Sequence, residues 1–200
     1  MDNTIKNEKY TAIVNTGRKL FWKHGMSRVS VEEICREANV SKMTFYRFFS
    51  NKVELGKTII DNIIDESVLK YRSLMKQGIP FEEKIRKQLL LKFEGTKEIS
   101  PEFVKDIYSN KKLGLHLHWQ KRADEFAKEV RNDYIKAQNE GFIRKDLNLD
   151  FMFYFSSKST DLLTDPQLLK MYGNMQDLIM EYANLFFLGI FPRHNEKNKP

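Results

Sequence analysis

The segment Ser41–Arg47 carries side chains whose chemistry suits contact with nucleic acid. Lys42 can donate to guanine O6 or N7, or it can serve phosphates alone. Met43 and the methyl group of Thr44 can contact the methyl group of thymine. We therefore expect these three residues to approach base edges.

Other polar side chains around this segment suit phosphate contacts. We expect Tyr46 and Arg47 to bind the backbone of the duplex. Lys52 stands where another helix is expected to begin, and the free amides of a helix N-terminus also favour an anion. Ser30 can act in the same way, although helix capping alone would explain it.

Two short helices joined by a tight turn must position these side chains. Ser30 and Glu33 form a capping box, and apolar residues follow at helical spacing over Val31–Ala38. Ser41 can cap the next helix, which is expected to run to about Phe48. The turn needs one residue in the left-handed conformation, and Asn39 tolerates it best after glycine. This pattern predicts a helix-turn-helix.

The rest of the chain is also predicted to be helical. Nine Gly and five Pro interrupt 200 residues, and no alternating strand pattern stands out. Capping signals and apolar spacing predict helices around Ile13 to Gly25, from Asn51 to about Gly78, over Phe81 to about Glu94, from Ser100-Pro101 onward, over Leu115–Asn139, over Asp150–Leu163, and from Asp165-Pro166 to about Ile190. The fold class is therefore expected to be all-α.

The segment Tyr10–Leu55 resembles the DNA-binding domain of the TetR family of bacterial transcriptional repressors. The resemblance rests on Ala12-Ile13, Leu20-Phe21, Gly25, Ser30-Val31-Glu32-Glu33-Ile34-Cys35-Arg36-Glu37-Ala38, Val40-Ser41-Lys42-Met43-Thr44-Phe45-Tyr46-Arg47-Phe48-Phe49 and Asn51-Lys52-Val53-Glu54-Leu55. The family usually has Gly where Asn39 stands. Met43 occupies a position that is often Gly, which should alter base preference rather than fold. The predicted DNA-contacting set is Ser30, Ser41, Lys42, Met43, Thr44, Tyr46, Arg47 and Lys52.

The resemblance also implies a division of the chain. A helix-turn-helix domain is expected over residues 1–55 and a helical regulatory domain, which binds a ligand and dimerises, over residues 56–191. Residues 192–200 are expected to form a disordered tail. The run Phe151–Phe155 is apolar on every side of its helix, so it must bury more than one face. Two C-terminal helices from each chain can thus form a two-fold interface, although a larger intramolecular core would also explain the pattern.

A regulatory pocket would be lined by aromatic and apolar groups with a few polar ones, so a hydrophobic or amphipathic small molecule is expected. The candidates are Phe93, Phe103, Tyr108, His116, Trp119, Phe126 and Tyr154. Each of them can equally be a plain core residue.

Composition limits the other classes of function. A net charge of +7, of which the first 55 residues supply +4, favours a polyanionic partner, although a merely basic surface also remains open. The single cysteine excludes an intrachain disulfide, and His116 and His118, two residues apart, point to different helix faces. Gly-rich phosphate loops, Gly-x-Ser-x-Gly and His-Glu-x-x-His are absent. We expect no enzymatic activity, metal, cofactor or membrane span, and a cytoplasmic location.

Together these features predict a sequence-specific transcriptional regulator. The favoured form is a homodimeric repressor that binds double-stranded operator DNA and is released by a small ligand. The alternative is a non-inducible DNA-binding protein with a global or nucleoid-associated role. The sequence leaves open the ligand, the operator, the target genes, and the choice between repression and activation.

Overall fold

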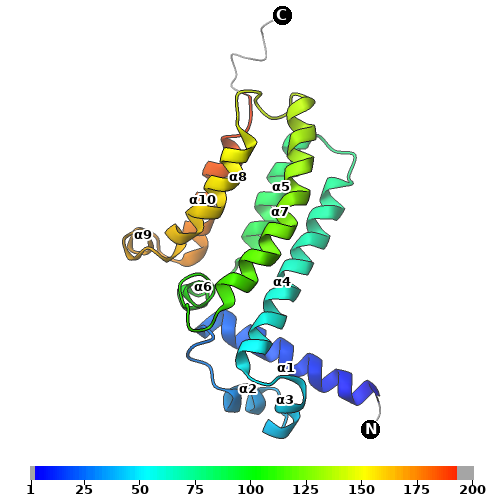
Figure 1. The fold of residues 1–200 in the computed structure, drawn as a ribbon, viewed down its shortest axis with the longest axis vertical. Helices are drawn as coiled ribbons and strands as arrows, with labels where there is room; N and C mark the ends of the chain where they lie inside the picture. The colour runs from blue at the N-terminus through cyan, green and yellow to red at the C-terminus, as the bar shows by residue number, and fades with distance from the viewer. Residues whose placement is uncertain (1–2, 193–200) are drawn as a thin grey trace, which may run out of the picture. The chain divides into compact units, whose positions relative to one another are not determined.

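The computed structural model describes residues 3–192, which contain helices and no strand (Figure 1). The elements are α1 (Asn3–His24), α2 (Val31–Glu37), α3 (Lys42–Phe48), α4 (Lys52–Met75), α5 (Phe81–Gly95), α6 (Pro101–Tyr108), α7 (Leu115–Asn139), α8 (Leu149–Ser159), the 3-10 helix η1 (Thr160–Thr164), α9 (Pro166–Met171) and α10 (Met175–Leu188). The all-α prediction is confirmed. The tail predicted over 192–200 lies, from residue 193 on, outside the described residues. No helix within residues 3–192 is both long and apolar enough to cross a bilayer.

The chain divides into two compact units. The N-terminal unit comprises Met1–Asp65 and Glu98–Gln120, and the C-terminal unit comprises Glu66–Lys97 and Lys121–Pro200. The N-terminal unit therefore extends beyond residue 55, where the helix-turn-helix domain is predicted to end. That boundary concerns the DNA-binding residues, and it stays a prediction.

The N-terminal unit includes α6 because this helix packs against the end of α1. The amide of Ser100 donates to the carbonyl of Trp22 at 3.0 Å, and the ring centroids of Trp22 and Phe103 lie 5.2 Å apart. Ser100 also caps α6, accepting from the amide of Phe103 at 3.2 Å. Helix α6 is thus held to α1 by backbone and aromatic contacts.

The short helices of the N-terminal unit begin where the capping residues predict. The Ser30 hydroxyl accepts from the Glu33 amide and the Ser41 hydroxyl accepts from the Thr44 amide, each at 3.1 Å. Asn51 caps α4 in the same way. These side chains satisfy amides that the helix itself leaves unpaired. Local hydrogen bonds therefore fix where α2, α3 and α4 start.

The turn between α2 and α3 also forms as predicted. Asn39 adopts φ 52°, in the left-handed region that the tight turn requires. Below the turn, a core of fully buried side chains joins α1 to α4: Ile13, Phe21, Ile34, Phe45 and Leu55. The helix-turn-helix is thus present, and its buried face is apolar.

The C-terminal unit is a helical bundle in which α10 packs against α5. Its core gathers Phe81, Ile85, Tyr134, Ala137, Ile143, Leu149, Met152 and Ile190. The predicted continuous helix from Asp165 to Ile190 is wrong, because α9 ends at Met171. Asn174 is extended and accepts from the Asp177 amide at 2.9 Å, so it caps a new helix. The helix predicted to reach Leu163 gives way to η1 after Ser159.

Candidate nucleic-acid interface

Helix α3 has one buried face and one exposed face. Phe45 is fully buried in the core, whereas Met43 is 82% and Tyr46 53% exposed. The helix is therefore held in place by its apolar side while its N-terminal turn stays open to solvent. This is the arrangement that lets a helix enter the major groove of DNA.

The polar groups of that turn are already paired. The Thr44 and Ser41 hydroxyls share a hydrogen bond of 3.0 Å. The Lys42 ammonium forms an ion pair with the carboxylate of Glu32 on α2. This contact holds the pKa of Glu32 below its ordinary value and raises the pKa of Lys42, so both groups stay charged at neutral pH.

Aromatic contacts fix the other end of α3. The Arg47 guanidinium lies over the Phe48 ring, 5.2 Å from its centroid. Tyr10 of α1 packs against Phe48 and Phe49, with ring centroids 5.6 and 5.4 Å away. Stacking on Phe48 orients the Arg47 side chain, which stays a predicted phosphate contact.

Lys52 has a structural role that the sequence did not indicate. Its ammonium donates to the carbonyls of Met26 and Val29 at 2.8 and 2.9 Å, and to that of Ser27 at 3.3 Å. These bonds fix the loop between α1 and α2. A phosphate contact by Lys52 stays a prediction, and the ammonium would have to share its donors to make one. Ser30 caps α2, which is the structural role that the sequence offered beside a phosphate contact.

Asp106 ties the same loop to α6. It is 5% exposed and accepts from the Ser27 amide at 2.8 Å, from the Ser27 hydroxyl, and from the Asn110 amide nitrogen at 3.1 Å. Gly25 adopts φ +77° beside it, and a Cβ there would lie 2.7 Å from Cβ of Glu102. Only glycine fits this close approach without displacement.

The seven predicted ligand-binding residues are spread over both units. Phe103, Tyr108, His116 and Trp119 belong to the N-terminal unit, and Phe93, Phe126 and Tyr154 to the C-terminal unit. Phe103 is buried against Trp22, and Phe126 packs edge-on against Tyr71. The ligand set therefore stays a prediction.

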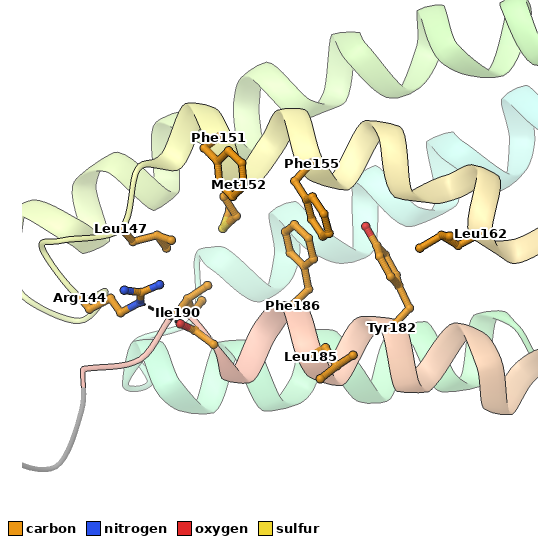
Figure 2. Close-up of a pocket in the computed structure, with 11 residues that line it drawn as sticks. Arg144, Leu147, Phe151, Met152, Phe155, Leu162, Tyr182, Leu185, Phe186 and Ile190 are labelled. Atoms are coloured by element: carbon orange, nitrogen blue, oxygen red, sulfur yellow. Dashed lines mark hydrogen bonds between the residues drawn. The ribbon is translucent and has the colours of Figure 1, made fainter. Parts of the chain in front are cut away.

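A groove in the C-terminal unit lies between α8 and α10, and none of those seven residues lines it (Figure 2). Its volume is about 300 Å³ and its wall is almost entirely apolar. Phe155 and Phe186 stack across it with centroids 6.1 Å apart. Arg144 closes one end and donates to the Gly189 carbonyl at 3.0 Å.

The described residues contain no group of three or more His, Cys, Asp or Glu side chains that could hold a metal ion. His118 instead contacts Asp61, with 2.9 Å between Nε2 and Oδ1. Cys35 is buried, and burial raises the pKa of its thiol.

Comparison with known proteins agrees with this geometry. Residues 13–57 match the family of bacterial regulatory proteins described as the tetR family. Two similar curated proteins are the HTH-type transcriptional regulators YuxN and YerO of Bacillus subtilis, each 27% identical. The matches cover 64% of this chain and 43% of YuxN, and 73% of this chain and 52% of YerO. The chain thus spans about half the length of the curated relatives it matches.

Solved structures share the fold. The fatty acid degradation regulator FadR from Bacillus halodurans aligns with a TM-score of 0.69 and 18% identity, covering 92% of this chain and 97% of that one. The regulatory protein TetR from Rhodobacter sphaeroides aligns with a TM-score of 0.68 and 16% identity, covering 90% and 98%. The protein is thus an all-α chain with an N-terminal helix-turn-helix domain. Its residues 13–57 carry the DNA-binding domain of the tetR family of bacterial regulatory proteins.

Proposed function

We propose that this protein is a sequence-specific DNA-binding transcriptional regulator. The observation that carries the proposal is the exposed first turn of α3, which is capped by Ser41 and anchored by the buried Phe45. Lys42, Met43 and Thr44 lie on that turn and can reach base edges in a major groove. Tyr46, Arg47 and Lys52 would add phosphate contacts, which position the protein without reading sequence. Its place of action would be the cytoplasm, where bacterial DNA lies.

The protein is proposed to act as a homodimer through α8 and α10. These helices leave large apolar side chains exposed: Phe151 62%, Tyr154 64%, Leu185 73% and Leu188 53%. Large apolar side chains exposed on two helices of one unit favour a protein–protein contact there. A two-fold axis would place two α3 helices in successive major grooves, about 34 Å apart.

Repression relieved by a small apolar or amphipathic ligand is the favoured mode of action. Among the proteins with a similar fold, one is named a fatty acid degradation regulator and another a ketosteroid transcriptional regulator. Both names point to apolar molecules, which agrees with the aromatic content of this chain. A ligand acts only if it binds the released state better than the DNA-bound state.

Contacts within the N-terminal unit can couple ligand binding to release from DNA. Asp106 of α6 binds both Ser27 groups, and Lys52 holds the carbonyls of the same loop. A displacement of α6 would therefore pull on the loop that precedes α2 and shift the helix-turn-helix. A ligand that binds the released state more tightly than the DNA-bound state would act on DNA binding through these hydrogen bonds.

Mapping the positions bound across the host genome tests the proposal. One or a few palindromic sites beside a transporter or enzyme gene would support local regulation, and repeating the map with that gene's substrate tests release. Dozens of dispersed sites would instead support the alternative, a non-inducible DNA-binding protein with a global role. The complete absence of sites would overturn DNA binding itself.

A further inference from the structure

Glu32 stands beside the candidate base-reading residue Lys42, although it is ten residues away in the sequence. It occupies the first turn of α2, and its carboxylate pairs with the ammonium of Lys42 at the start of α3. Their side chains are 59% and 55% exposed. The contact thus lies on the open side of the helix-turn-helix, where incoming DNA can compete for it.

Neutralising Lys42 has unequal effects on the two kinds of DNA contact. Attraction to phosphates depends on net charge, because each protein cation that neutralises a phosphate releases counterions from the DNA. A hydrogen bond to guanine O6 or N7 depends on a local N–H donor, and an ammonium bound to one carboxylate keeps further donors. The pair therefore weakens phosphate binding more than base recognition.

Two other cationic groups of the site make contacts of a different kind, with carbonyl oxygens and with an aromatic ring. Lys52 donates to neutral carbonyl oxygens. Arg47 lies over an aromatic ring. Lys42 is a candidate base-reading cation, and a carboxylate from the neighbouring helix balances its charge.

We propose that Glu32 is a specificity-determining residue: it offsets the charge of Lys42 and so suppresses binding to non-cognate DNA. This inference rests on the proposed DNA-binding function. Exposed ion pairs are weak, so the expected effect is a few-fold change in affinity. A few-fold change matters because a genome offers a very large number of competing non-specific sites.

The test compares Glu32→Gln with a matched control, Glu37→Gln. Glu37 lies on the same helix, is 53% exposed and pairs with the adjacent Arg36, so its loss changes the net charge equally. Each full-length variant is titrated with a random-sequence duplex of about 30 base pairs. A second titration uses a duplex enriched by the wild-type protein from a random pool. Thermal unfolding checks that both variants are folded.

For Glu32→Gln we expect about threefold to tenfold tighter binding to the random duplex at low salt, with little change for the enriched duplex. The dependence of log affinity on log salt should steepen by about 0.9, since one more phosphate is neutralised. The specificity ratio then falls at least about threefold. In a Lys42→Gln background the same substitution should leave the slope unchanged.

Equal slopes and equal specificity ratios for Glu32→Gln and Glu37→Gln would overturn the inference. Weaker binding of Glu32→Gln to both duplexes would also overturn it, because the carboxylate would then support Lys42 rather than offset it. If the wild-type protein enriches no sequence, the proposed function fails separately. The difference in slope on the random duplex would still decide whether Glu32 neutralises Lys42.

Discussion

Gly25 is the position where α6 approaches the loop after α1 most closely, and Gly25→Ala tests that packing. A Cβ at Gly25 would lie 2.7 Å from Glu102 Cβ, 3.0 Å from Asp106 Oδ2 and 3.1 Å from the Glu102 carbonyl carbon. Two of these atoms are close to or within the α6 backbone, so the helix itself must shift. Overpacking of this kind costs about 1–3 kcal/mol.

The backbone adds a second cost at the same residue. Gly25 has φ +77°, where an L-residue is disfavoured by about 1–2 kcal/mol. The expected loss of unfolding free energy is therefore about 2–5 kcal/mol. Gly114→Ala is the matched control, since Gly114 has φ +65° with no atom within 4 Å of the added Cβ. Gly114→Ala should lower the unfolding free energy only by the cost of the left-handed backbone conformation, about 1–2 kcal/mol.

Urea unfolding followed by tryptophan fluorescence measures the difference. Both tryptophans, Trp22 and Trp119, belong to the N-terminal unit, so the signal reports that unit alone. Equal protein concentrations remove any effect of dimerisation. An equal loss for the two variants would refute the close packing of α6 on the loop.

Three further predictions concern other parts of the chain. Ser41→Ala should cost about 1 kcal/mol of unfolding free energy by removing the cap of α3, measured by the same urea titration. Leu185→Glu should convert the proposed dimer to monomers in light scattering, whereas Leu69→Glu, at a similarly exposed residue of α4, should leave the mass unchanged. Burial and the hydrogen bond to Asp133 raise the pKa of Tyr71, so the folded state keeps a proton that the unfolded chain loses above about pH 10. Stability should therefore fall as pH rises past that point, and circular dichroism should show a shallower fall for Tyr71→Phe.

The features that the sequence predicted well depend on neighbours along the chain. Ser30, Ser41 and Asn51 each accept from an amide three residues on, and Asn39 takes the strained turn position. Such hydrogen bonds need no knowledge of tertiary packing. The starts of α2, α3 and α4 therefore followed from residue types alone.

The break before α10 has a local signal in the sequence. Asn174 and Asp177 have the spacing of a helix cap, and Asn174 does cap α10. The apolar spacing on both sides suggested one continuous helix and concealed the break. Gly173, directly before the cap, favours a turn there.

The features that the sequence missed depend on residues far apart in the chain. Lys52 binds carbonyls about 25 residues earlier, and Asp106 binds Ser27 across 79 residues. The partner of Lys42 lies on another helix. Composition and periodicity contain no signal for such pairs, because they arise only when the helices pack. The seven aromatic and histidine candidates for ligand binding are divided between the two units, and they stay a prediction.

Selection of duplexes from a random pool by the purified, full-length protein tests the central claim most directly. The account predicts enrichment of a two-fold symmetric sequence whose half-sites lie about one helical turn apart. It further predicts that Met43→Ala alters the base preferred at one position of each half-site, whereas Lys57→Ala, on α4, leaves the enriched sequence unchanged. Enrichment of no sequence, or an identical sequence for Met43→Ala, would contradict the assignment of the first turn of α3 as the reading surface.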